Sequence, residues 1–277
     1  MINEERIGVG VITFNREELF WKCWRSLENC SDIIDEYVAV NDGKPYSVMP
    51  EIYSGDVTLF KHKKSIGVGP SKNEALRHLL GNGCDHIFLV EDDIFVKNPE
   101  VFSKYIEASK VSGIQHFNFS QHGIMNKTFD QQRAPNPRTT ISYGDVSVSL
   151  YPHCVGAFSY YSRKCLETVG LMDERYFNAC EHVDHTYEII KAGMHPSFWY
   201  FADIANSWEY LGDEEWSLQN STISSNPNHK QMMIDADKIF VEKHGHLPGQ
   251  TKLDSIPEMG KTLKSIKAKY GINPVNV

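Results

Sequence analysis

The segment His86-Ile-Phe-Leu-Val-Glu-Asp-Asp93 joins a short apolar run directly to three acidic residues. Apolar runs of this length, rich in branched and aromatic side chains, are typical of buried strands. The three successive carboxylates repel one another unless water or a cation compensates them, and hard divalent cations such as Mn²⁺ and Mg²⁺ prefer oxygen ligands. The segment therefore predicts a buried strand that ends either in a metal site or in a solvated acidic turn.

Similar apolar runs precede it at 7–13, 37–40 and 57–60, and helical spacing of apolar residues predicts helices over 17–27, 70–80 and 99–112. Strands that alternate with helices in this way predict a parallel sheet with right-handed crossovers and helices on both faces. Ligands of such sheets bind at the carboxyl ends of the strands. Thr13, Asp42 and the acids 91–93 all fall at such ends, so we expect the chemistry where their loops meet.

The rest of the chain is less regular. A polar loop over 126–136, typical of a lid, precedes a hairpin or edge strand over 139–150. Helices are expected over 162–170, 181–192, 232–244 and 261–270, and a strand over 196–201. The predicted fold class is α/β, with a mostly parallel central sheet flanked by helices, a small antiparallel element and a carboxyl-terminal helical extension. We expect one domain over 1–205, with halves 1–112 and 113–205, and an extension over 206–277 that packs on it.

Composition narrows the classes of function. The 277 residues are 41% hydrophobic and carry a net charge of -8, which is typical of a globular protein and disfavours a nonspecific nucleic-acid binder. Apolar runs are too short to span a bilayer, and no secretory signal opens the chain. The six cysteines are scattered without a C-x-x-C pair, which favours reduced thiols and a cytoplasmic location.

Two loops carry candidate ligand-binding residues. The loop Ser65-Ile-Gly-Val-Gly-Pro-Ser-Lys-Asn73 lacks the spacing of known phosphate loops, but its small residues let backbone approach a ligand. Lys72 can face a phosphate, and Asn73 can bond to a ribose or to backbone. The turn Asn41-Asp42-Gly43 needs no function, although Asp42 can also accept hydrogen bonds from a nucleobase or ribose.

In this order, Thr13-Phe-Asn-Arg16, Asn41-Asp-Gly43, Gly67-x-Gly69-x-x-Lys72-Asn73 and Glu91-Asp-Asp93 resemble the glycosyltransferase family 2 group, which has the Rossmann-like GT-A fold. The resemblance implies a metal-dependent, inverting transfer of a sugar from a nucleotide-diphosphate sugar, most often a UDP-sugar, with Mn²⁺ or Mg²⁺. It places Thr13, Asn15 and Arg16 in the nucleotide pocket, Asp42 at the base, Lys72 and Asn73 near ribose and phosphate, Glu91 and Asp92 at the donor, and Asp93 with Asp92 at the metal. The family usually has Arg at Lys72 and Asp at Glu91, so both changes keep the charge.

The second half resembles the family's acceptor side. Val155-Gly-Ala-Phe158 matches the segment under the donor sugar, and Glu181-His-Val-Asp184 matches the acidic segment that supplies the general base. The family typically has Asp where His182 stands. We expect the base to be Glu181 first, then His182 or Asp184, although His182 can also be a plain helix-start residue. His229 matches a late histidine that related enzymes give to the metal, but twelve histidines make a coincidence easy.

Other functions stay open. A sugar-phosphate nucleotidyltransferase shares the layout, but usually has a glycine-rich loop after its first strand. The change at His182 is also compatible with an inactive module that binds a nucleotide sugar or a glycan. The acceptor can be a glycan, a lipid-linked glycan, a protein or a hydroxylated nucleobase in DNA. Arg133, Arg138 and the lysines at 261, 264, 267 and 269 could contact phosphates, but the net charge weighs against DNA.

Overall fold

The computed structural model describes residues 5–47, 57–214 and 225–272. Its elements, in chain order, are β1 (Ile7–Thr13), α1 (Glu17–Glu28), β2 (Glu36–Asn41), β3 (Val57–Lys61), α2 (Val68–Gly81), β4 (His86–Glu91), β5 (Ile94–Val96), α3 (Val101–Ser112), β6 (His116–Asn118), β7 (Thr139–Tyr143), β8 (Val146–Tyr151), β9 (Phe158–Ser162), α4 (Arg163–Val169), α5 (Glu181–Lys191), β10 (Phe201–Ile204), α6 (Ser207–Tyr210), β11 (Leu211–Asp213), α7 (His229–His244), a 3-10 turn (Pro248–Gln250) and α8 (Ile256–Tyr270). The expected alternation of strands and helices in the first hundred residues is present.

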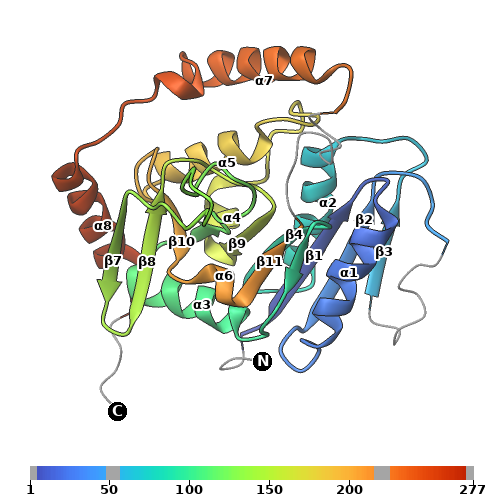
Figure 1. Cartoon of the computed structure of the whole chain (residues 1–277), viewed down its shortest axis with the longest axis horizontal. Coiled ribbons are helices and arrows are strands. Elements are labelled where there is room, and N and C mark those ends of the chain that lie inside the picture. The colour runs from blue at the N-terminus through green and yellow to red at the C-terminus, as the bar shows by residue number, and fades with distance from the viewer. Residues whose placement is uncertain (1–4, 48–56, 215–224, 273–277) are drawn as a thin grey trace.

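Six strands form the central sheet, in the order β3-β2-β1-β4-β9-β6 (Figure 1). The first four strands are parallel, as predicted, and their register places Thr13 beside Asn41 and Ile12 beside Glu91. The chain runs outward from β1 to β2 and β3, and then crosses back over β1 to β4. Such a reversal opens a crevice at the carboxyl ends of the strands, where ligands of α/β proteins bind. The fold therefore brings the ends of β1 and β4 together at a binding edge.

Two glycines in β1 let a helix lie close to the sheet. A Cβ on Gly8 would lie 2.7 Å from the Leu79 Cδ2, and one on Gly10 would lie 2.9 Å from the Ala75 Cβ. Both distances are too short for real side-chain contacts, so any larger residue would push α2 away from the sheet. The glycines of the first strand therefore set the position of α2, which carries Lys72.

Strand side chains alternate between two cores, because successive residues of a strand face opposite sides of a sheet. Helices α1 and α3 cover one face, and that core includes Val9, Val11, Phe20, Phe88, Phe102 and Tyr105. Helices α2, α4 and α5 cover the other face, with Val38, Leu76, Ile87, Leu89, Leu166 and Ile189. Both faces of the sheet are buried, which explains why its strands read as continuous apolar runs.

Antiparallel strands complete the fold. β9 pairs antiparallel with both β4 and β6 inside the central sheet. β7 and β8 form the expected hairpin, joined by β10, and β5 pairs with β11. The strand expected over 196–201 is wrong, because β10 only begins at Phe201. Trp199 adopts a positive φ of 72°, and residues 197–200 form a turn closed by a 3.0 Å hydrogen bond from the Tyr200 N–H to the Ser197 carbonyl.

The carboxyl-terminal segment consists of α7, which crosses above α5, and α8, which lies beside α3 and β7 (Figure 1). Met259, Leu263 and Ile266 bury one face of α8, and Ser255 and Glu258 form a capping box at its start. All six cysteines are free thiols. Within the described parts of the chain, every helix is too short or too polar to span a lipid bilayer.

Candidate active site

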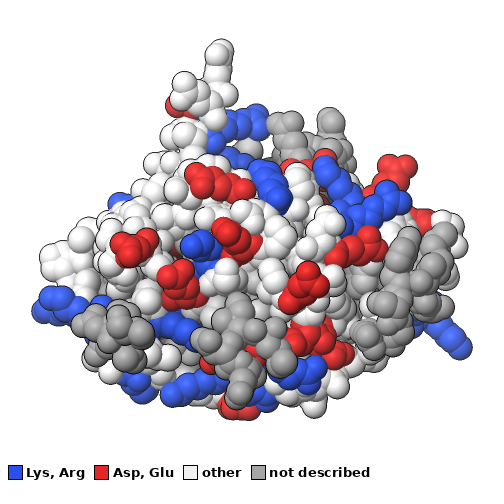
Figure 2. Space-filling view, turned by 90° about the horizontal axis from the view of Figure 1, so that it is seen from below, with Lys and Arg blue, Asp and Glu red and all other residues white. Residues whose placement is uncertain are grey.

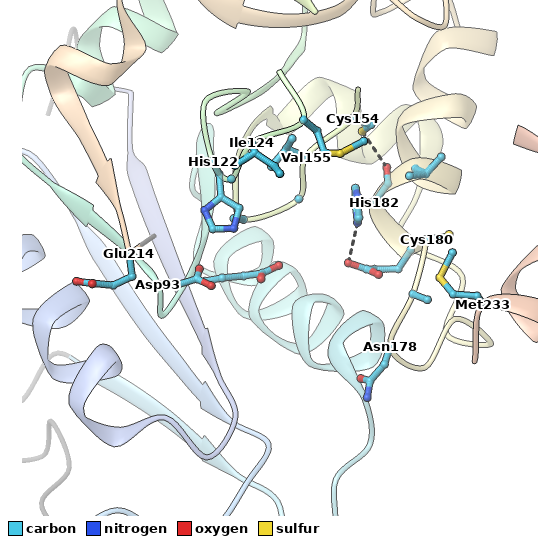
Figure 3. Close-up of a pocket in the computed structure, with 18 of the residues that line it drawn as sticks. Asp93, His122, Ile124, Cys154, Val155, Asn178, Cys180, His182, Glu214 and Met233 are labelled. Atoms are coloured by element: carbon cyan, nitrogen blue, oxygen red, sulfur yellow. Dashed lines mark hydrogen bonds and ion pairs between the residues drawn. The ribbon is translucent and has the colours of Figure 1, made fainter. Parts of the chain in front are cut away.

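A cavity of about 720 Å³ opens at the carboxyl ends of β1 and β4. Its walls come from Arg16, from Glu91 and Asp93, from the loop 122–125, from 154–157, from 178–183, and from Glu214 and Met233. Figure 3 shows Asp93 and His122 on one side of this cavity and His182 on the other. Segments distant in sequence thus meet at the edge of the sheet where the chemistry was expected.

The acidic triplet that ends β4 divides its side chains between the protein interior and the cavity. Asp92 is buried, accepts a hydrogen bond of 2.6 Å from the Thr13 hydroxyl and forms an ion pair with Arg16. Burial raises its pKa to about 7, although Arg16 and Thr13 act in the opposite direction. Asp93 lines the cavity, where Arg16 contacts its Oδ2 at 2.9 Å and its buried Oδ1 has no hydrogen-bond partner.

Lys72 is buried between the two halves of the site. Its ammonium lies 2.7 Å from Glu91 Oε1 and 2.9 Å from Glu181 Oε1, and it donates to the Gly156 carbonyl at 3.1 Å. Burial alone would lower the pKa of Lys72, but the two carboxylates raise it. Lys72 is therefore a permanent cation that joins the end of β4 to the start of α5, and its three contacts use its three N–H groups.

Helix α5 begins at a strained residue. Cys180 has a φ of 63°, and this sharp entry turns Glu181 inward toward Lys72. Burial would raise the pKa of Glu181, but Lys72, followed by His182, lowers it well below its ordinary value. The Glu181 carboxylate is thus held ionised, and a carboxylate held so firmly is a poor proton acceptor.

His182 faces the cavity beside Glu181. Its Nδ1 lies 3.1 Å from Glu181 Oε1, and the ring packs on Gly156, where an added Cβ would lie 2.7 Å from the His182 Cγ. About a quarter of its side chain is exposed. With Nδ1 occupied by a carboxylate, Nε2 is the nitrogen left for the cavity.

Asp184 belongs to the opposite side of α5. It is buried, and it bonds to the Tyr176 hydroxyl at 3.2 Å, to His244 Nε2 at 2.8 Å and to the Lys243 ammonium. It therefore anchors α7 to α5 and does not line the cavity. The alternative that Asp184 is the base thus finds no support in its position.

Asp42 and Asn73, expected at the base and the ribose, are saturated by the protein itself. Asp42 accepts four hydrogen bonds, which come from His62, the Ser65 hydroxyl and the backbone N–H groups of 66 and 67. Asn73 is fully buried and exchanges hydrogen bonds with both the N–H and the carbonyl of Met172. Both side chains hold the loop 65–73 in place, and neither has a free polar atom for a nucleotide.

A second cavity of about 580 Å³ lies beside the ends of β1, β2 and β3. It is lined by Phe14, Asn15, 42–45, 61–63 and Ser65, and three of these residues are lysines, at 44, 61 and 63. Asn15 adopts a φ of 58° and accepts a hydrogen bond of 2.8 Å from the Lys44 N–H. This cationic cavity suits an anionic or electron-rich ligand, and Arg16 lies in the wall of its neighbour.

Sequence reasoning missed two residues beside the larger cavity, His122 and Asp213. His122 Nδ1 lies 3.3 Å from Asp213 Oδ2, and this carboxylate also accepts the Gly123 N–H at 2.9 Å. Burial would lower the pKa of His122, but Asp213 and Asp93 raise it. The missed signal was a histidine just after β6, which runs parallel to β4 and ends at the same edge of the sheet.

The acidic and histidine side chains offer only part of a metal site. Among the described residues, no three His, Cys, Asp or Glu side chains converge as a complete metal site. His229 begins α7 and is not among the residues that line the cavity, and Asp92 is committed to Thr13 and Arg16. The unpartnered Oδ1 of Asp93 nevertheless fits a cation of the Mg²⁺ or Mn²⁺ type, since such ions commonly bind one or two carboxylates and take their other ligands from substrate phosphates and water.

This chain is similar in sequence to a viral protein. No protein-family model matches the chain. The uncharacterized glycosyltransferase R363 of Acanthamoeba polyphaga mimivirus is 24% identical over 214 residues, which are 75% of this chain and 78% of that protein.

Solved structures share the fold at low identity. TarS of S. aureus has a TM-score of 0.54 at 14% identity, over 96% of this chain and 42% of TarS. GalNAc-T7, solved with UDP, GalNAc and Mn²⁺, has a TM-score of 0.58 at 12% identity, and the match covers 95% of this chain and 54% of GalNAc-T7. The mannosyltransferase PcManGT from Pyrobaculum calidifontis was solved with GDP-Man and Mn²⁺. It has a TM-score of 0.57 at 12% identity, and the match covers 97% of this chain and 76% of PcManGT. The chain thus spans about half or less of TarS and GalNAc-T7. These likenesses confirm the predicted GT-A fold.

Proposed function

We propose that this protein is a glycosyltransferase that moves a sugar from a nucleotide-diphosphate sugar to a hydroxyl group of an acceptor. The observation that carries the proposal is a single cavity that holds Asp93 and Arg16 on one wall and His182 on the other. The first pair suits a diphosphate with its cation, and the histidine suits the removal of a proton. The relatives support the same class, because R363 is named a glycosyltransferase, and TarS and PcManGT were solved with UDP-GlcNAc and GDP-Man.

The two cavities bind different parts of the donor. The nucleoside occupies the cationic cavity beside β1, β2 and β3, and the diphosphate lies near Arg16, at the edge of the larger cavity. Because the Asp42 carboxylate is saturated, the base contacts other groups of that cavity, such as Asn15 and the lysines. A uridine donor remains the first to test, with guanosine next.

A divalent cation, Mn²⁺ or Mg²⁺, completes the donor site. Asp93 would hold it through Oδ1, with diphosphate oxygens and water as further ligands. When bound, such a cation neutralises charge that develops on the departing nucleoside diphosphate. Arg16 already contacts the other oxygen of Asp93, so it stays close to the same diphosphate.

His182 is the general base of this proposal, and Glu181 positions it. The acceptor hydroxyl gives its proton to His182 Nε2 while its oxygen bonds to the anomeric carbon. The bond from that carbon to the diphosphate oxygen breaks in the same displacement, which inverts the anomeric configuration. Glu181 orients the ring through Nδ1 and stabilises the imidazolium that forms, and Lys72 keeps Glu181 ionised.

The acceptor side of the cavity is largely apolar. Ile124, Met125, Val155, Val183 and Met233 line it, so the acceptor presents its hydroxyl from a partly apolar body. On the face that Figure 2 shows, basic and acidic side chains of the described residues are interspersed. That face lies opposite the cavity, at the amino-terminal ends of the parallel strands. The net charge of -8 disfavours DNA, which is bound by continuous basic surfaces, and so favours a glycan or another compact acceptor.

Donor turnover tests the proposal. UDP-, GDP-, dTDP- and CDP-sugars are incubated with the protein and Mn²⁺, and the released nucleoside diphosphate is measured, since a donor is slowly hydrolysed by water even without acceptor. We expect one donor to be consumed, with the rate lost in EDTA and reduced at least about 100-fold in Asp93→Ala, because the cation then loses its carboxylate.

Two results would contradict the transferase. Tight binding of a donor without any turnover, with a panel of glycan acceptors present, would favour a binding module. Release of pyrophosphate from a nucleoside triphosphate would favour a nucleotidyltransferase.

A further inference from the structure

The loop after β6 places a histidine–carboxylate pair on the cavity wall beside Asp93. His122 Nδ1 faces Asp213 at 3.3 Å, and only 13% of the His122 side chain is exposed. Figure 3 shows its ring next to the Asp93 carboxylate, at the border of the cavity. Since Asp213 occupies the Nδ1 side, Nε2 is the nitrogen that the ring offers to the cavity.

The chain holds this histidine at both ends of its loop. Before it, the Ser120 N–H donates to the buried Asp203 carboxylate at 2.8 Å. After it, the Gly123 N–H donates to Asp213 at 2.9 Å, and the Asn126 side chain donates to the Ser120 carbonyl at 3.0 Å. The loop is therefore a fixed support, and His122 does not depend on a lid movement to reach the cavity.

We propose that His122 is a direct ligand of the donor-site cation, together with Asp93, and that it makes the site prefer Mn²⁺ to Mg²⁺. This inference rests on the proposed function and deepens it. Histidines that bind metals commonly direct their other ring nitrogen to a carboxylate, and His122 Nδ1 lies 3.3 Å from Asp213 Oδ2. Mg²⁺ takes oxygen ligands almost only, whereas the first-row transition-metal ion Mn²⁺ also accepts an imidazole nitrogen.

A site with two protein ligands is compatible with the finding that no three His, Cys, Asp or Glu side chains converge among the described residues. Asp93 Oδ1 and His122 Nε2 would supply two ligands, and diphosphate oxygens and water would supply the others. His182 already faces Glu181, and His229 is not part of the cavity wall, so neither replaces His122 in this role.

Pulsed EPR of bound Mn²⁺ tests the inference without any turnover. Mn²⁺ is added to the full chain, first alone and then with UDP, and the ¹⁴N modulation of a coordinated imidazole is recorded. We expect the modulation in the wild type with UDP, its loss in His122→Gln, and its retention in the matched control His229→Gln. Mn²⁺ affinity should fall about 10–100-fold in His122→Gln and about 10-fold in Asp213→Asn, with a smaller loss of Mg²⁺ affinity in competition.

The inference is overturned if the modulation persists in His122→Gln, if bound Mn²⁺ shows none in the wild type, or if the Mn²⁺ to Mg²⁺ affinity ratio is unchanged. If His122→Gln does not fold, the Mn²⁺ affinity of Asp213→Asn and the ¹⁴N modulation of the wild type still test the inference. Turnover of a donor in EDTA would support the proposed transferase function but contradict His122 as a ligand of a required cation. An imidazole signal that depends on His122, without turnover of any donor, would support His122 as a cation ligand but contradict the proposed transferase function.

Discussion

Two acidic segments meet in this protein, Glu91-Asp92-Asp93 at the end of a strand and Glu181-His182-Val183-Asp184 at the start of a helix. In each, the leading glutamate contacts Lys72, at 2.7 Å and 2.9 Å. In each, a second acid is buried in a structural role, Asp92 with Thr13 and Asp184 with α7. The remaining polar residue, Asp93 or His182, lines the cavity. Neighbouring residues of one motif can thus have unrelated tasks.

The difference lies in how each element distributes its side chains. Asp92 and Asp93 form the turn between β4 and β5, and this turn places Asp92 in the protein interior and Asp93 at the cavity, where Glu91 also lies. In the helix, about 100° separates successive residues, so Asp184 lies about 200° from His182. The number of acids in a motif therefore says less about its function than the geometry of the element that carries it.

The largest expected effect tests the division within the second segment. His182→Ala should lower kcat by about 100- to 10,000-fold, because the acceptor loses its base, with little change in the affinity for the donor. Asp184→Asn should keep kcat within about tenfold and instead lower the midpoint of urea unfolding, because it weakens the contacts that hold α7. Steady-state kinetics and urea titration of both variants measure this contrast. A larger loss of kcat in Asp184→Asn would exchange the roles of these two residues.

The second effect tests the residue that the two segments share. Lys72→Met should lower the free energy of unfolding by about 3–5 kcal/mol, since it leaves Glu91 and Glu181 close together without their cation. Urea unfolding followed by circular dichroism measures it, and Lys264→Met, on the exposed side of α8, is the matched control. A loss as small as that of the control would mean that the two segments are independent.

The smallest effect concerns acid stability. The pKa of Glu181 is lowered in the folded protein, so its ionisation stabilises the fold above its unfolded pKa, and this stabilisation is lost as the pH falls. Between about pH 5 and pH 3, Glu181→Gln should therefore lose about 1 kcal/mol less than the wild type. Urea midpoints at the two pH values measure the difference, with the exposed Glu167→Gln as control. Equal losses in Glu181→Gln and the wild type would show that Lys72 does not hold this carboxylate.

Much of the fold could be predicted, because periodic apolar runs carry the information. The parallel strands of the first half, the hairpin of β7 and β8 and the helices α4 and α5 fall close to the expected ranges. The three-residue strands β5, β6 and β11 could not be predicted, since their pairing depends on partners distant in sequence. His122 was missed for that reason, because its place follows from β6.

Side-chain roles were harder to predict than their locations. Thr13, Glu91 and Asp93 do gather at one edge of the sheet, as their positions at strand ends indicated, and Arg16 and Lys72 contact these acids there. Asp42 and Asn73 lie at the same edge, but their side chains are hydrogen-bonded to backbone N–H groups and a carbonyl of the protein itself. Whether a polar side chain is free for a ligand depends on such contacts, which no local pattern of residue types encodes.

The antiparallel strand β9 has a consequence for the order in which the protein is made. It pairs with β4 from His86↔Ser162 to Val90↔Phe158, so this edge of β4 waits for residues synthesised more than sixty positions later. Until β9 leaves the ribosome, a nascent chain that ends after α3 presents an apolar strand with an open row of N–H and carbonyl groups. Such edges pair readily with other chains. The segment over residues 1–112 is thus an incomplete folding unit, and fragments cut near residue 112 are expected to aggregate.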